Sequence, residues 1–268
     1  MVRFVSIPKE KHSLLNEDAI LAFPSGLAVS DGAGGGGLFA DLWSNYLVSN
    51  IPNHPILTWD ELDKWLSAIW ENFYNSCEIK AKSMGGLALE KFYEEGSFAT
   101  LAAVWFDDKT HCCHWMAYGD SVVFHYRAIK NTLEYSIASL ESFNESPHLI
   151  NCKDVPNKDG LTTGVFKLHR DSIVFVCSDA LSHYVLLMYY IENKHKYNEI
   201  IKRCTNSHTR NSTIVKTALY SQCDTFKNIL FKLISSSKNR ANLRRHLSSL
   251  ERKGLLSSDD YSFGYIIL

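Results

Sequence analysis

Apolar residues recur at helical spacing in two stretches of the first third of the chain. They occupy positions 38, 39, 42, 43, 46 and 47 in the first stretch, and 62, 65, 66, 69, 70, 73 and 74 in the second. This period places the apolar side chains on one face of a helix. Thr58, with Glu61 three residues later, fits the capping box that begins many helices. We therefore predict two amphipathic helices, the second one long.

The middle of the chain is rich in short apolar and β-branched runs, which are typical of strands. We predict strands at 26–29, 97–105, 114–118, 122–126, 172–177 and 261–268. The glycine-rich stretch 30–37 is interpreted as a turn. Helical spacing returns at 181–203, 215–233 and 239–252, with Gly254 at the position where a glycine often ends a helix.

These elements predict an α+β fold in which helix-rich layers surround mostly antiparallel sheets. The chain has 268 residues, no internal repeat and no clear linker. We expect one domain spanning 1–268.

Bulk composition excludes several classes of protein. Hydrophobic residues make up 46% and charged residues 21%, and the formal net charge is -1. Such a chain has no overall attraction for nucleic acid or an anionic membrane. It also lacks the roughly 20 consecutive apolar residues of a membrane helix, and its first residues do not resemble a leader. We expect a cytoplasmic monomer with no nucleic-acid or membrane partner.

The seven cysteines lack C-x-x-C spacing, and two of them, Cys112 and Cys113, stand between His111 and His114. A zinc site is one interpretation of this cluster. Reduced thiols are the simpler one, because neighbouring side chains of a strand point to opposite faces.

Acidic residues recur where predicted strands meet turns. Asp31 follows the strand 26–29, Asp120 lies between two strands, Asp179 follows 172–177, and Asp259 precedes the final strand. Glu17 and Asp18 precede another apolar run. Loops at strand ends are where a scaffold presents reactive groups.

Carboxylates gathered in one place repel one another unless a cation neutralises them. Mg²⁺ and Mn²⁺ prefer such oxygen ligands, and a pair of these ions can share a bridging carboxylate and a water that attacks phosphorus. Glycines beside Asp31 would also let a backbone carbonyl, such as that of Gly32, approach an ion.

The acidic segments, taken in order, resemble the motifs of the type 2C metal-dependent protein phosphatases. Six segments carry the resemblance across most of the chain: Asn16-Glu-Asp-Ala, Asp31-Gly-Ala-Gly-Gly, Gly96-Ser-Phe-Ala-Thr, Gly119-Asp-Ser, Ser178-Asp-Ala-Leu and Asp259-Asp-Tyr-Ser. The resemblance implies a four-layer α-β-β-α sandwich, with a helical flap within about 185–253 that shapes substrate access.

The resemblance also implies roles for particular residues. Asp31 would bridge two Mn²⁺ or Mg²⁺ ions, and Asp179 and Asp259 would complete the first metal site. The Gly32 carbonyl and Glu17 would serve the second. Asp18 would hold bound waters and act with Asp31 in catalysis, and Asp120 would hold a weaker third ion. The implied reaction is direct attack of a metal-bridging hydroxide on the phosphoserine or phosphothreonine of a protein substrate.

Several positions depart from the family pattern. An arginine that grips phosphate in many members is replaced by Ser13, beside His12, so these two residues become the candidates for substrate binding. Ala33 stands where some members have a histidine, and Ala180 where a glycine is usual. His183 stands where many members have an acid for the third ion.

These departures motivate an alternative function, a non-catalytic phosphatase-like module that binds a phosphoprotein. A third hypothesis, nucleotide binding by the loop from Asp31 to Gly37, is disfavoured because the loop lacks a P-loop lysine and a dinucleotide fingerprint. A basic set in the last third is interpreted as a solvated helix face or as a surface for an acidic partner: Arg240, Arg244, Arg245, Arg252 and Lys253.

Overall fold

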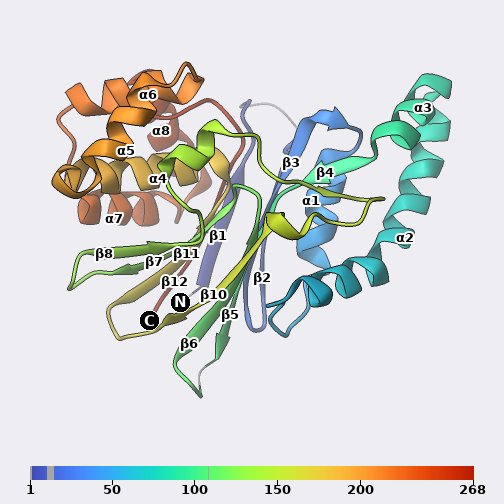
Figure 1. Cartoon of the computed structure of the whole chain (residues 1–268), viewed down its shortest axis with the longest axis horizontal. Helices are drawn as coiled ribbons and strands as arrows, with labels where there is room; N and C mark the ends of the chain where they lie inside the picture. The colour runs from blue at the N-terminus through green and yellow to red at the C-terminus, as the bar shows by residue number, and fades with distance from the viewer. Residues whose placement is uncertain (1, 11–14, 108) are drawn as a thin grey trace.

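Two antiparallel β-sheets pack face to face, and helices cover the outer face of each (Figure 1). The structure is a computed structural model that describes residues 2–10, 15–107 and 109–268. The four layers follow the order helix, sheet, sheet, helix, as the sequence resemblance implies.

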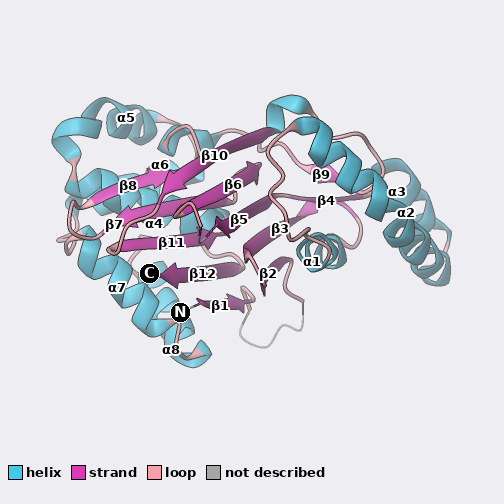
Figure 2. Cartoon of the chain, turned by 90° about the horizontal axis from the view of Figure 1, so that it is seen from below, coloured by secondary structure: helices cyan, strands magenta, loops and turns pink. Residues whose placement is uncertain are grey.

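The first sheet has five strands in the order β1-β12-β11-β7-β8. It brings both ends of the chain together, because β1 pairs with β12 (Figure 2). Its strands are β1 (Val2–Ile7), β7 (Val122–Arg127), β8 (Thr132–Tyr135), β11 (Ser172–Cys177) and β12 (Tyr261–Ile267).

The second sheet has seven strands, with β10-β6-β5-β3-β4-β9 in order and β2 paired to β3. Its strands are β2 (Asp18–Phe23), β3 (Gly26–Gly37), β4 (Ser97–Ala99), β5 (Leu101–Asp107), β6 (Cys112–Tyr118), β9 (Ile150–Asn151) and β10 (Leu161–Lys167). The 3-10 turns η1 (Leu140–Asn144) and η2 (Lys158–Gly160) lie in the connections.

Alternating side chains divide the interior into three cores. In β11, Ile173 and Phe175 face the helices, whereas Val174 and Val176 face the other sheet, because successive strand residues point to opposite faces. The helices α1 (Ala40–Ser49), α2 (Trp59–Met84) and α3 (Gly86–Glu95) cover the second sheet. The first sheet is covered by α4 (Asp179–Glu192), α5 (Lys194–Asn206), α6 (Arg210–Tyr220), α7 (Phe226–Ser236) and α8 (Arg240–Arg252).

Strand register brings the predicted acidic segments to one end of the sandwich. In the first sheet, Cys177 at the end of β11 pairs with Val122 at the start of β7 and with Phe263 near the start of β12. In the second sheet, Tyr118 at the end of β6 pairs with Leu101 at the start of β5. The link from β6 to β7 joins the two sheets at this end and carries Asp120.

The predicted elements differ from the structure mainly in where strands and helices are interrupted. The stretch 30–37 continues β3 and is not a turn, although its pairing with β4 is irregular between Gly32 and Gly37. The predicted helix 181–203 is divided at Asn193 into α4 and α5, and 215–233 is divided into α6 and α7. None of the helices in the described residues is both long and apolar enough to cross a membrane.

Candidate metal centre

Asp18 and Asp31 are neighbours across the β2–β3 ladder, where their Cα positions pair directly. The backbone of Asp31 is fixed on its other side by Thr100, whose N–H donates to the Asp31 carbonyl at 2.8 Å. The Thr100 hydroxyl accepts from the Asp31 N–H at 3.3 Å. Two acidic side chains are thus held side by side on a rigid part of the sheet.

Glu17 is positioned by its backbone. Its N–H donates to a carboxylate oxygen of Asp260 at 2.6 Å. Its carbonyl accepts from the Gly32 N–H at 3.0 Å and from the Ser44 hydroxyl at 2.5 Å. The Glu17 carboxylate lies over Gly34, where an added Cβ would be 2.1 Å from Oε1.

Asp260 is a functional candidate that the sequence interpretation missed. Its second carboxylate oxygen accepts from the Lys9 N–H at 2.5 Å, so one side chain holds two N-terminal backbone segments against the start of β12. The sequence contained a hint in the adjacent acids Asp259 and Asp260, but the family resemblance implied a role only for Asp259.

Asp179 begins α4 immediately after the buried strand β11. A carboxylate oxygen of Asp179 accepts from the Ala180 N–H, which suits an acid at the positive end of a helix. The preceding residue, Ser178, exchanges two hydrogen bonds with Ser262. The Ser178 N–H donates to the Ser262 carbonyl at 3.2 Å, and the Ser262 N–H donates to the Ser178 hydroxyl at 3.0 Å. This pair ties the segments of Asp179 and Asp259 together.

Asp120 lies in the tight link between the two sheets, where Gly119 has a φ of +92° that favours glycine. The next residue, Ser121, shares a hydrogen bond of 2.7 Å with the hydroxyl of Thr100. Thr100 therefore connects the Asp120 turn to the backbone of Asp31.

Mutual electrostatic effects show that the acids converge. Burial raises the pKa of Asp31 well above its usual value, and Asp18, Asp179, Asp120 and Asp259 raise it further. Like charges have this effect on a carboxyl group only when they are near it. Four acids thus lie near Asp31: Asp18 from the paired strand β2, and Asp120, Asp179 and Asp259 from three segments that are far away in sequence.

Burial is also the largest cause of the raised pKa values of the neighbouring acids. The pKa of Asp120 rises to about 7 and that of Asp179 to about 6, and in both cases another aspartate adds to the effect. The pKa values of Glu17 and Asp259 are raised as well, and Asp260 contributes to both shifts.

The chemistry of this donor set fits hard divalent cations. Asp18 is 3% exposed and neither of its carboxylate oxygens has a hydrogen-bond partner of normal geometry, although the hydroxyls of Ser178 and Ser262 lie near enough to oppose the rise in its pKa. A buried carboxylate without partners is costly unless a cation or bound water compensates it.

The side chains are not yet arranged as a complete ligand shell. Among the described residues, no three His, Cys, Asp or Glu side chains are grouped so that they could hold one ion. Asp31 and Asp179 do influence each other's pKa, so their side chains lie close together. Gly32 is also closely packed, since an added Cβ would be 2.6 Å from the Ala40 carbonyl oxygen.

Other candidate positions lie elsewhere or outside the described residues. His12 and Ser13, the predicted substrate contacts, belong to the part of the chain that the structure does not describe. His183 is buried and packs edge-on against Phe143, and burial lowers its pKa to about 4. All seven cysteines are free thiols, and Cys113 is buried whereas Cys112 is half-buried.

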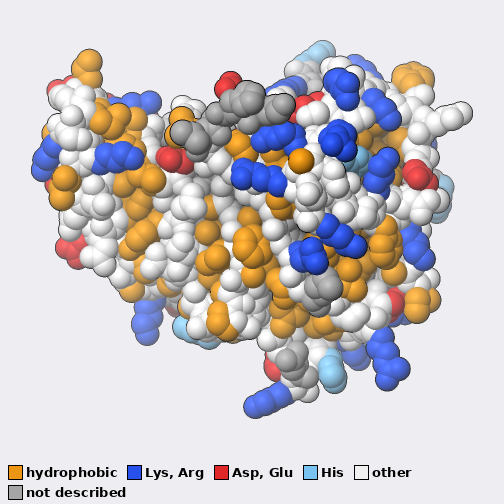
Figure 3. Space-filling model, turned by 180° about the vertical axis from the view of Figure 1, so that it is seen from behind, with side chains coloured by type: hydrophobic (Ala, Val, Ile, Leu, Met, Phe, Trp, Pro, Cys, Tyr) orange, Lys and Arg blue, Asp and Glu red, His pale blue; other side chains and the backbone are white. Residues whose placement is uncertain are grey.

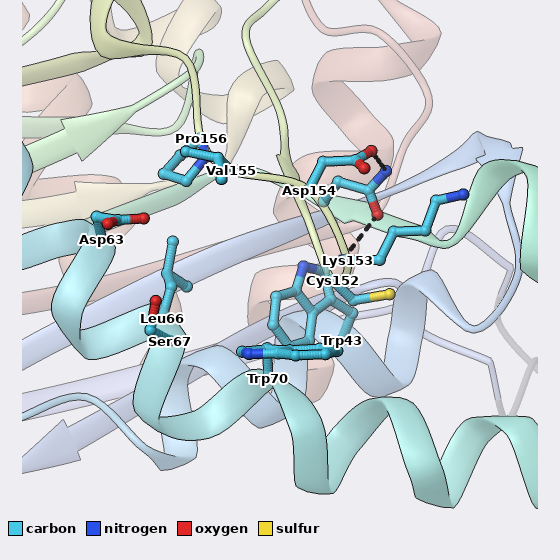
Figure 4. A pocket seen from close by; sticks show the side chains of 11 residues that line it. Trp43, Asp63, Leu66, Ser67, Trp70, Cys152, Lys153, Asp154, Val155 and Pro156 are labelled. Carbon is cyan, nitrogen blue, oxygen red and sulfur yellow. Dashed lines mark hydrogen bonds between the residues drawn. The ribbon is translucent and has the colours of Figure 1, made fainter.

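A separate hollow of about 210 Å³ lies between α2 and the segment after β9. Figure 4 shows Trp43 and Trp70 at its base and Asp154 and Val155 across from them. None of the acids of the carboxylate cluster around Asp31 lines this hollow. The carboxylate cluster, and not this hollow, is the candidate site.

The four-layer arrangement is the fold of bacterial serine/threonine phosphatases of the type 2C kind. The similarity to these phosphatases lies in the structure. No family model and no curated protein sequence matches the chain.

Particular solved structures are similar over almost the whole chain. The Mycobacterium tuberculosis phosphatase PstP/Ppp is 16% identical, with coverage of 99% of this chain and 97% of that one and a TM-score of 0.53. The PstP catalytic domain in complex with two manganese ions is also 16% identical, with coverage of 99% and 96% and a TM-score of 0.52. Stp1 from Staphylococcus aureus is 14% identical, with coverage of 100% and 94% and a TM-score of 0.50. At these identities the likeness establishes the fold, which confirms the predicted fold class.

Proposed function

We propose that the protein is a metal-dependent serine/threonine protein phosphatase that hydrolyses phosphomonoesters of phosphoserine and phosphothreonine in proteins. The observation that carries this proposal is the convergence of four acids around Asp31, three of them from distant segments, at one end of a β-sandwich. The fold shared with known phosphatases supports it.

The residues suggest how two Mn²⁺ or Mg²⁺ ions would be held. Asp31 would serve both ions, Asp179 and Asp259 the first, and the Gly32 carbonyl with Glu17 the second. Asp120 would hold a weaker third ion. When bound, the ions would neutralise phosphate charge and lower the pKa of a shared water toward neutrality.

The chain's own contribution is positioning. The carboxylate of Asp260 accepts a hydrogen bond from the backbone N–H of Glu17. Thr100 fixes both the backbone of Asp31 and the turn that carries Asp120. We propose that Asp18, which is buried beside Asp31, orients water at the carboxylate cluster. Such pre-arranged groups reduce the reorganisation that the reaction requires.

The remaining predictions complete this proposal. We propose that 1–268 acts as one catalytic domain, as a monomer in the cytoplasm. The helical region within about 185–253 covers the first sheet, and we propose that part of it shapes substrate access.

The test is the loss of activity when Asp31 or Asp179 is neutralised. Asp31→Asn and Asp179→Asn should each reduce Mn²⁺-dependent hydrolysis of p-nitrophenyl phosphate by at least roughly 100-fold, because each removes a ligand charge. The circular-dichroism spectrum of each variant should remain that of the folded wild-type protein. Glu71→Gln, at an exposed position on α2, is the control and should leave the rate unchanged. Near-normal rates in either aspartate variant would refute the assigned roles.

A non-catalytic binding module is the second candidate. It is favoured by the lack of a ready three-ligand group among the described residues and by the serine at position 13. Folded wild-type protein that shows no turnover with either Mn²⁺ or Mg²⁺, but that binds a phosphoprotein, would support the module and exclude the phosphatase.

A further inference from the structure

We propose that Arg210, at the start of α6, binds the phosphate group of the substrate. This inference rests on the proposed phosphatase function and assigns the phosphate contact to a helix about 200 positions away from Ser13, where the sequence comparison looked for it.

The position of Arg210 is next to the carboxylate cluster. Its side chain is exposed, and a guanidinium nitrogen lies 3.5 Å from the carbonyl oxygen of Ser258. Ser258 immediately precedes Asp259 in the chain. The guanidinium group therefore lies at the edge of the candidate metal centre.

The donors of Arg210 remain available for a ligand. In the described part of the chain it forms no ion pair with a carboxylate, and its long bond to Ser258 uses only one of its five N–H groups. A planar guanidinium group matches a phosphate through two parallel hydrogen bonds.

The start of α6 is anchored, so that the backbone of Arg210 is held in place. The hydroxyl of Thr209 donates to the Asn144 side chain at 2.7 Å, and the Asn211 side chain donates to the Phe143 carbonyl at 2.8 Å. Both partners belong to η1, which packs against α4. A cationic side chain on an anchored backbone loses less conformational freedom on binding an anion than one on a mobile segment.

Electrostatics explains why such a cation is needed. A phosphomonoester dianion that approaches several carboxylates is repelled unless positive charge faces it. Figure 3 shows Lys and Arg side chains gathered mainly over the half of the molecule that α4–α8 occupy. Arg210 belongs to this half, and its guanidinium group contacts the residue that precedes Asp259.

The experiment compares Arg210→Ala and Arg210→Lys with wild type in the full-length chain. We expect Arg210→Ala to raise both the KM for p-nitrophenyl phosphate and the inhibition constant of inorganic phosphate by roughly 10- to 100-fold, the loss of a charge-assisted contact. Arg210→Lys should give a smaller rise, because it keeps the charge but not the paired donors. Arg245→Ala, at another exposed arginine, is the control and should change neither constant.

A second measurement separates phosphate binding from simple charge balance. If Arg210 only offsets the charge of Asp179 and Asp259, Arg210→Ala would strengthen Mn²⁺ activation and leave the phosphate inhibition constant unchanged, which would overturn this inference. An inactive wild type would instead refute the proposed phosphatase. Calorimetric titration of the Mn²⁺-loaded protein with inorganic phosphate would then still test Arg210, and equal affinities in wild type and Arg210→Ala would overturn the inference.

Discussion

At the scale of single residues, two adjacent glycines in β3 differ in what surrounds them. A Cβ added at Gly34 would meet the Glu17 carboxylate at 2.1 Å, whereas one added at Gly35 would have no heavy atom within 4 Å. The contact at Gly34 is with the flexible end of a side chain, so the fold can tolerate it. The Glu17 carboxylate, however, would have to move.

We therefore expect Gly34→Ala to weaken Mn²⁺ activation of p-nitrophenyl phosphate hydrolysis by several-fold, with a melting temperature close to that of wild type. Displacing one proposed metal ligand is the physical reason. Gly35→Ala is the matched control and should activate normally. Equal Mn²⁺ dependence in the two variants would show that Glu17 does not serve the metal centre.

The residues of the candidate site differ in how far the sequence predicts them. Asp31 and Asp179 follow predicted strands, which made both of them candidates. Their strands belong to different sheets, however, and only the family resemblance implied that the two acids meet. The contribution of Asp260 could not be predicted, because it depends on backbone N–H groups of Lys9 and Glu17 that are remote in sequence. The proximity of Arg210 to the site could not be predicted for the same reason, because its contact Ser258 is 48 positions away in the sequence.

At the scale of elements, local signals predicted helix ends better than helix lengths. The capping box of Thr58 and Glu61 is present at the start of α2. Gly254, with a φ of +68°, accompanies two hydrogen bonds that close α8: Gly254 N–H to the Glu251 carbonyl, and Leu255 N–H to the Leu250 carbonyl. Both signals act within a few residues, so the sequence alone contains them.

The missed elements depend on partners that are far away in the chain. The edge strand β1 exists because it pairs with β12, and β10 because it pairs with β6. The glycine-rich end of β3 has little strand propensity, yet contacts with β4 hold it extended. Tertiary pairing thus overrode the local turn signal.

We predict that Thr58→Ala lowers the free energy of unfolding by about 1 kcal/mol, since the helix loses the hydroxyl that accepts from the Glu61 N–H. Urea denaturation would measure the change, and phosphatase activity should persist because α2 lies away from the acids. Thr213→Ala, at an exposed position inside α6, serves as the comparison and should be neutral or slightly stabilising. An unchanged midpoint for Thr58→Ala would mean that this cap contributes nothing to stability.

At the scale of the whole molecule, the buried acids couple stability to pH. The pKa of Asp120 is raised to about 7 in the folded protein, above the value of about 3.9 for an unperturbed aspartate. Between these values the folded state binds more protons, so the contribution of Asp120 becomes less favourable as pH rises. His183, whose pKa is lowered to about 4, has the opposite effect over part of this range.

The difference between wild type and Asp120→Asn isolates this contribution, because the histidines are common to both. In metal-free protein, we expect the melting temperature of Asp120→Asn to exceed that of wild type increasingly as pH rises from 5 to about 8, and the two to approach each other near pH 4. Glu71→Gln should show no such trend. A constant difference across this range would contradict the raised pKa of Asp120.

The pairing of β1 with β12 has a consequence for biosynthesis. The acidic cluster combines Glu17, which precedes β2, with Asp259, which precedes β12, and the carboxylate of Asp260 holds the backbone of Glu17. A growing polypeptide on the ribosome therefore lacks a working centre until β12 has emerged. The enzyme that we propose would begin to remove phosphate only after β12 has been synthesised, so a chain that stops before β12 would be inactive.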